Sequence, residues 1–132
     1  MKNTIVTFTV AIFIALFACI NCACAQDWMK KDTKVASLLV DTTYVRSMVV
    51  TIMPKEKGSV HTHPAHFFYA LTDGTLIVHF TDGKSETYEL KAGDSGYSDP
   101  ERPHWTENVG DKPVKFLLVE LKEHPYVQAR NK

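Results

Sequence analysis

The chain has 132 residues, and its 15 basic and 15 acidic side chains give a formal net charge of zero. A neutral chain without a basic, aromatic-lined patch has no field that attracts nucleic acid, and this length fits one domain. A small molecule is therefore the expected ligand, and nucleic acid is excluded as a partner.

The first 25 residues have the pattern of a secretory signal peptide. Lys2 precedes an apolar run at 5–20, which is followed by the small residues Ala23, Cys24 and Ala25. A basic start, an apolar stretch and an A-x-A site are typical of a leader that is removed on export. The run is shorter than the ~20 residues that span a bilayer, so we expect no transmembrane helix. The sequence predicts an exported protein, periplasmic or secreted.

A second interpretation of the leader stays open. The residues at 16–19 resemble a bacterial lipobox, after which Cys19 would carry lipid and anchor the chain as a lipoprotein. All three cysteines, Cys19, Cys22 and Cys24, lie in this segment, so cleavage after Ala25 leaves 107 residues without a thiol. Such a domain has access to an oxidising compartment but forms no internal disulfide and offers no thiolate to a metal.

Beyond the leader we expect a flexible arm at 26–34, a β-barrel at 35–124 and a polar tail at 125–132. No window has a helical period, and short runs rich in Val, Thr, Tyr and Phe alternate with turn formers such as Asp82-Gly83. The predicted strands lie at 35–40, 45–53, 67–71, 76–80, 86–90, 104–109 and 114–121. Short strands at this spacing predict an all-β sandwich or barrel.

Three of the six histidines lie within six residues, at positions 61, 63 and 66. On extended backbone His61 and His63 share one face and are ~6.6 Å apart along the strand. Imidazoles so placed can tilt onto one ion at ~2.0–2.1 Å from each nitrogen. This H-x-H pair is therefore a candidate bidentate metal ligand.

Two segments resemble the paired motifs of the cupin superfamily. The first motif is H-x-H, three or four residues, Glu, six residues and Gly; the second is G-x5-P-x-G-x2-H-x3-N. The matching residues are His61, His63 and Gly74 in the first motif, and Gly93, His104 and Asn108 in the second. The resemblance covers residues 45–121 and implies a double-stranded β-helix (jelly roll) whose metal is bound by His61, His63 and His104. It also implies a homodimer.

The first motif lacks its usual carboxylate, because Phe67 stands at the glutamate position. Alternation from His63 predicts that Phe67 faces inward and fills that place with apolar surface. The same alternation turns His66 outward, although Pro64 interrupts the strand and keeps His66 as a candidate fourth ligand.

The second motif also departs from the family pattern, since Asp99 and Glu101 replace its Pro and Gly. We expect these two changes to alter the shape of a loop rather than the metal chemistry. Asp99 is the better candidate for acid–base work, because Glu107 has the opposite parity to His104 and is expected to face outward. His79 is interpreted as a residue of the outer sheet face. No catalytic residue is assigned.

Three neutral imidazoles suit one divalent transition metal, Fe, Zn, Ni or Cu. The candidate pocket residues are Phe67 and Tyr69, which flank the ligands, and Thr106 and Asn108, which share the parity of His104. The favoured hypothesis is an exported single-domain metal-binding cupin enzyme. It would be an oxygenase, isomerase or lyase acting on a small anionic or oxygen-rich molecule. The alternatives are a cupin that binds a sugar or acid without turnover, metal-free or not, and a metal-free remnant with structural histidines.

Overall fold

The structure is a computed structural model that describes residues 35–129. The leader, the alternative lipobox and the arm predicted from the sequence lie outside the described residues, as does the end of the tail. Within residues 35–129, no helix is long and apolar enough to cross a membrane.

The described residues form β-strands joined by turns, with no helix among them. In chain order they are β1 (Ala36–Asp41), β2 (Val45–Ile52), β3 (His61–His63), β4 (His66–Ala70), β5 (Gly74–Phe80), β6 (Ser85–Leu90), β7 (Ser95–Ser98), β8 (Glu101–Asn108) and β9 (Val114–Leu121). All seven predicted strands are present, and β3 and β7 are additional. Both of these are short, so sequence pattern alone gave little signal for them.

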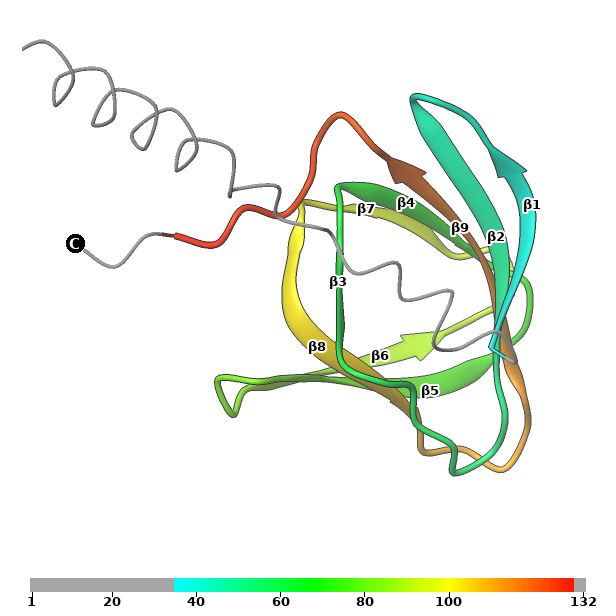
Figure 1. Ribbon diagram of the computed structural model, residues 1–132. Coiled ribbons are helices and arrows are strands. Elements are labelled where there is room, and N and C mark those ends of the chain that lie inside the picture. The colour runs from blue at the N-terminus through cyan, green and yellow to red at the C-terminus, as the bar shows by residue number, and fades with distance from the viewer. Residues whose placement is uncertain (1–34, 130–132) are drawn as a thin grey trace, which may run out of the picture.

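The strands build two facing antiparallel sheets. One has the order β1-β2-β9-β4-β7 and the other the order β3-β8-β5-β6. Figure 1 shows the two sheets curving around a common interior. The chain crosses from one sheet to the other between β3 and β4, where Pro64 and Ala65 leave the strand. This is the jelly-roll barrel that the sequence predicted, and the all-β fold class is confirmed.

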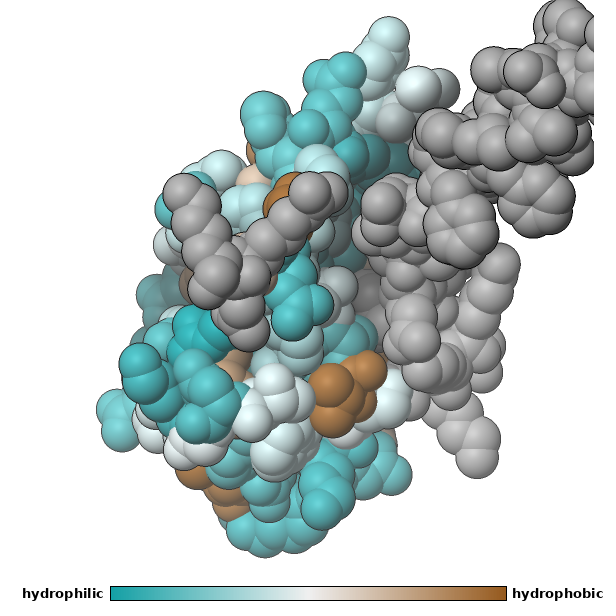
Figure 2. All heavy atoms as spheres, turned by 60° about the vertical axis from the view of Figure 1, so that its left-hand side comes forward, coloured by the Kyte–Doolittle hydropathy of each residue, from teal (hydrophilic) through white to brown (hydrophobic). Residues whose placement is uncertain are grey.

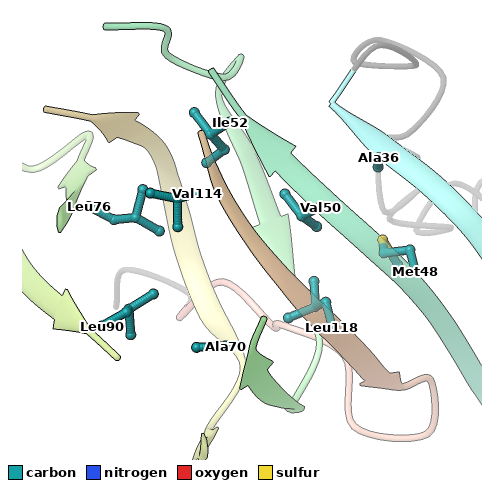
Figure 3. Packing of buried hydrophobic residues seen from close by; sticks show 9 residues of the cluster. All are labelled: Ala36, Met48, Val50, Ile52, Ala70, Leu76, Leu90, Val114 and Leu118. Carbon is teal, nitrogen blue, oxygen red and sulfur yellow. The ribbon is translucent and has the colours of Figure 1, made fainter. Parts of the chain in front are cut away.

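Alternation along the strands fills the interior with aliphatic side chains. Met48, Val50 and Ile52 of β2 point inward, and Val114 and Leu118 of β9 lie beside them. Figure 3 shows these side chains meeting Leu76, Leu90 and Ala70 from the other strands. Each fully buried aliphatic side chain contributes about 1.5–3 kcal/mol. The apolar core therefore holds the two sheets together without a disulfide in the described residues.

Tight packing at one motif glycine has a direct cause. A Cβ on Gly74 would collide with the side chain of Val114, so the start of β5 can approach β9 only because position 74 lacks a side chain. Gly93 has a different role, since its φ of 96° lies in the left-handed region that glycine adopts without strain.

The outer surface is mostly hydrophilic but carries exposed aromatic side chains. Figure 2 shows a face on which hydrophilic side chains predominate and hydrophobic ones form separate spots. On the outside of the five-stranded sheet, Phe67, Tyr69 and Tyr97 keep 40–60% of their area exposed. Phe67 is paired with Tyr97 across β4 and β7, so two of these aromatics are neighbours.

Candidate metal centre

Three histidines converge where β3 and β8 lie side by side. His61 and His63 come from β3, and His104 comes from the neighbouring β8, where it is the register partner of His61. One ligand atom from each residue lies within 4.8 Å of the other two. The Nε2 atoms of His61 and His63 are 3.0 Å apart, and His63 and His104 are both buried. The trio predicted from the sequence motifs is thus brought together.

The far nitrogen of each ring is held by an acceptor. The Nδ1 atom of His61 donates to the carbonyl of Ser59 at 2.7 Å, and that of His104 donates to the carbonyl of Arg102 at 2.8 Å. A carbonyl only accepts, so both rings carry their proton on Nδ1 and present a lone pair on Nε2. Outer hydrogen bonds of this kind fix the tautomer and orientation of metal-binding imidazoles. The rings are oriented as ligands.

His63 is anchored by a buried ion pair that crosses between the sheets. Its Nδ1 donates to Glu120 Oε1 of β9 at 2.7 Å, and Glu120 Oε2 accepts from Arg46 of β2 at 2.6 Å. Burial opposes ionisation of Glu120, but the hydrogen bonds from His63 and Arg46 outweigh it and lower its pKa to about 2. Sequence analysis missed both charged residues. Their signal was parity, since Arg46 and Glu120 occupy inward positions on otherwise apolar strands.

Burial keeps the site imidazoles neutral. Loss of solvent lowers the pKa of His63 from 6.5 to about 3, against the opposing effect of the hydrogen bond that His63 donates to Glu120. The pKa of His104 is lowered as well, first by burial and then by the neighbouring His61. Only neutral imidazole ligates a metal, so the protein holds these two rings in the ligating form.

The prediction that Phe67 faces inward is wrong. Phe67 is 40% exposed, whereas His66 is only 5% exposed. The physical reason is the crossing at Pro64 and Ala65, which breaks the alternation counted from His63 and resets it in β4. His66 therefore faces the interior, with its ring centroid 5.0 Å from that of His63 and its Nδ1 donating to the carbonyl of Pro64 at 3.0 Å. It lies beside the trio without belonging to it.

Glu101 lies in the site rather than in a loop. It begins β8, and its Oε2 is 3.3 Å from Nε2 of His104. The expectation that this residue only alters the shape of a loop is wrong, because the loop residue of the motif is here part of a strand. Asp99, the acid–base candidate, is instead exposed.

A cavity of about 90 Å³ opens beside His63 and His104. Its polar lining includes His66, Glu101 and Thr106, and its walls are the apolar side chains of Phe68, Leu76, Val78, Leu90, Phe116 and Leu118. Of the four residues predicted for the pocket, Thr106 lies in this lining. Phe67 and Tyr69 do not, because they are on the outer face of β4.

Asn108, the fourth predicted pocket residue, closes the barrel wall instead. Its Nδ2 donates to the carbonyls of Ile52 and Lys112, and its Oδ1 accepts from the backbone of Gly110. The side chain is fully buried. All its hydrogen-bonding groups are used by the backbone, so its presence in the second motif has a structural cause.

His79 and Glu107 belong to the outer face of the four-stranded sheet, as predicted. His79 stacks on Trp105 with ring centroids 5.1 Å apart, and its Nε2 is 3.1 Å from Glu107. This pair lies outside the group of three histidines, so a substitution at His79 or Glu107 serves as a control for substitutions in that group.

Comparison with known proteins agrees with the fold and the histidine spacing. Residues 48–120 match the family model for the cupin domain. The chain belongs to the cupin family. Over 83 residues it is 31% identical to the oxalate decarboxylase OxdC of Bacillus subtilis (strain 168), an alignment that covers 61% of this chain and 22% of that enzyme. The chain therefore spans less than a quarter of the length of this curated relative.

Solved structures similar to this cupin have the same barrel. A cupin domain from Bordetella pertussis superposes with a TM-score of 0.61 at 22% identity, over 66% of this chain and 91% of that one. A protein with a double-stranded β-helix domain from Klebsiella pneumoniae gives a TM-score of 0.55 at 25% identity, over 66% and 75%. Cupins often bind a metal, and the donor set of His61, His63 and His104 fits one: three oriented nitrogens around one point.

Proposed function

We propose that this cupin is a metal-dependent enzyme that acts on a small anionic molecule. The observation that carries the proposal is the convergence of three imidazoles, each with its Nδ1 held by an acceptor and its Nε2 directed at the others. This donor set suits Fe, Zn, Ni or Cu. Three protein ligands leave coordination positions for substrate, which is typical of reactive rather than structural sites.

The substrate class follows from the size and the lining of the cavity. A cavity of about 90 Å³ suits a small molecule. A carboxylate or enolate would be drawn to the metal end, and its remainder would contact the apolar walls. The similarity to a protein named oxalate decarboxylase supports a small carboxylic acid.

The residues of the chain have separate roles in this proposal. A divalent metal, when bound, supplies a Lewis acid or an oxygen-binding centre. The three imidazoles hold it, and Glu120 fixes the orientation of His63. Phe68, Leu76 and Val78 exclude water and so strengthen electrostatic interactions in the cavity. Oxygenase, isomerase and lyase chemistry are all compatible with this arrangement.

A second candidate function is capture of the same small acid without turnover. The observation in its favour is the apolar character of the walls, in which Glu101 is the one carboxylate among the described lining residues. Incubation of metal-loaded protein with a panel of small carboxylic acids, followed by NMR, separates the two functions. An enzyme consumes one of the acids, whereas a binding protein only broadens its signals.

Elemental analysis of the purified protein tests the metal centre. We expect about one transition metal ion per chain in the wild type and in His79→Ala, whose imidazole lies on the outer face. We expect none in His63→Ala. Metal content that is equal in all three, or absent from the wild type, would contradict the proposal.

We also propose that the chain is exported and that the barrel forms a homodimer. The leader pattern at 1–25 supports export, and fractionation of cells that express the full chain tests it. The exposed aromatics Phe67, Tyr69 and Tyr97 support pairing through the five-stranded sheet. Sedimentation of the wild type and Tyr97→Asp tests it, since only the wild type should sediment as a dimer.

A further inference from the structure

We propose that Glu101 is an anionic ligand of the metal centre and takes over the task of the carboxylate that Phe67 replaces in the first motif. The inference rests on the proposed three-histidine centre and adds to it the residue that changes its charge. Its support comes from the backbone of β8, from the contact with His104 and from the surroundings of the carboxylate.

The backbone of β8 has one extra residue between Glu101 and His104. In the pairing of β3 with β8, His61 faces His104 and His63 faces Glu101, so two steps along β3 match three steps along β8. Residues three apart on a regular strand point to opposite faces. The extra residue is a β-bulge, a device that redirects side chains, and it lets Glu101 and His104 enter the cavity together.

The contact between Glu101 and His104 joins two acceptors. His104 carries its proton on Nδ1, because that nitrogen donates to the carbonyl of Arg102. Its Nε2 therefore presents a lone pair to the Glu101 oxygen 3.3 Å away. Two acceptors at this distance repel each other unless a cation lies between them.

The same relationship recurs within the trio, where the Nε2 atoms of His61 and His63 are 3.0 Å apart. Ligands ~2.0–2.1 Å from one tetrahedral ion are about 3.4 Å from each other. The Glu101–His104 contact, at 3.3 Å, has this spacing, and the His61–His63 contact, at 3.0 Å, is shorter. A cation bound beside His104 would be attracted by both acceptors of the Glu101–His104 contact. The ligand atoms within 4.8 Å of one another are those of the three imidazoles, so the Glu101 carboxylate joins them by rotation of its side chain.

The surroundings of Glu101 favour a positive charge beside its carboxylate. Its side chain is 20% exposed and borders a cavity with mostly apolar walls. Placing a carboxylate there costs free energy unless it is paired with a positive charge. His66 also faces this interior, but its contact with the centre is ring to ring, at 5.0 Å from His63, rather than between ligand atoms.

A carboxylate ligand changes which metals bind. Three imidazoles alone hold oxygen-preferring ions such as Mn²⁺ weakly, whereas an anionic oxygen favours them. It also reduces the charge of the loaded centre from +2 to +1. We therefore expect this cupin to bind Mn²⁺ as well as Co²⁺.

Metal titration of the purified chain tests the assignment, with Co²⁺ and Mn²⁺ as probes. The variants are Glu101→Gln and, as the matched control, Glu107→Gln, which alters a carboxylate on the outer face of the same strand. We expect Glu101→Gln to weaken Mn²⁺ binding at least tenfold and to change the visible absorption spectrum of bound Co²⁺. Glu107→Gln should change neither.

The outcomes separate this inference from the proposed centre. Absence of Co²⁺ binding in the wild type would overturn the centre itself. Binding that His63→Ala abolishes, with a Co²⁺ spectrum unaltered in Glu101→Gln, would overturn only the ligand role of Glu101, even if the affinity fell through lost charge. Glu101→Asp is a second variant that keeps the charge and withdraws the oxygen. It should change the Co²⁺ spectrum too, and an unaltered spectrum would again overturn the assignment.

Discussion

Glu120 and His63 lie in different sheets, and the carboxylate of one is 2.7 Å from Nδ1 of the other. The same carboxylate binds Arg46 on the adjacent strand. A histidine that faces the cavity is thus connected through a buried ion pair to the middle of the five-stranded sheet. The orientation of a metal ligand and the docking of the two sheets depend on the same side chain.

Replacing Glu120 by Gln should weaken metal binding while leaving the trio intact. The amide accepts a weaker hydrogen bond than the carboxylate, so His63 loses basicity and orientation. Loss of such an outer partner typically costs 10–100-fold in affinity. Isothermal titration with Co²⁺ measures this, with Glu107→Gln as the control. An affinity within twofold of the wild type would mean that Glu120 serves only the fold.

The metal-free protein should lose stability as the pH falls below 6.5. The pKa of His63 is lowered from 6.5 to about 3 in the folded state. Between these two pH values, His63 therefore binds a proton in the unfolded chain but not in the folded chain. Stability is therefore greatest above pH 6.5 and declines toward pH 3. His63 alone should remove about 1.4 kcal/mol per pH unit within this window.

Urea unfolding of chelator-treated protein at pH 7.5 and pH 5.5 measures this change. The lowered pKa of His104 acts in the same direction. The Glu120 contribution is lost only at lower pH, from 4.5 toward its folded value of about 2. In His63→Gln the decline between pH 7.5 and 5.5 should be shallower, and an equally steep decline would contradict the assignment to His63.

Phe67→Glu should leave metal affinity within twofold of the wild-type value. The family motif suggests that a carboxylate here would restore a ligand, but the side chain at position 67 points away from the cavity. Titration with Mn²⁺ decides between these views. Tighter binding would show that β4 presents position 67, not 66, to the centre.

Asn108→Ala should destabilise the barrel without changing the metal stoichiometry. The substitution leaves the buried carbonyl of Ile52 without its donor and releases the 108–112 turn. Unsatisfied buried groups cost about 1–3 kcal/mol each, so a loss of about 2–4 kcal/mol is expected in urea unfolding. A folded variant that has lost its metal would place Asn108 in the site instead.

Regular features of the barrel could be predicted from the sequence. Alternation and turn residues predicted seven of the strands, and the resemblance to the cupin motifs implied that His104 joins the H-x-H pair 41 positions earlier. The strand predictions succeed because strand period and glycine conformation are local properties, whereas the long-range meeting of the histidines came from the family resemblance. The outward position of His79 follows from the same alternation.

Irregular backbone explains the predictions that were wrong. The inward orientation assigned to Phe67 assumed one continuous strand from His63, whereas the chain changes sheets at Pro64 and Ala65. Glu101 was missed because a bulge, which has no signal in residue type, turns it toward His104. The Arg46–Glu120 pair requires knowledge of which strands are adjacent, and β2 and β9 are far apart in sequence.

The extra residue in β8 has a consequence for how this barrel can diverge. Because the bulge alone brings Glu101 to the same side as His104, a chain that kept the same residues but paired β3 with β8 without the bulge would turn the carboxylate to the solvent face. Every histidine and the glutamate would still be encoded, yet the donor set would change from mixed oxygen and nitrogen to nitrogen only. Under the assignment of Glu101, the metal preference of such chains depends on the register between two strands as much as on their side chains.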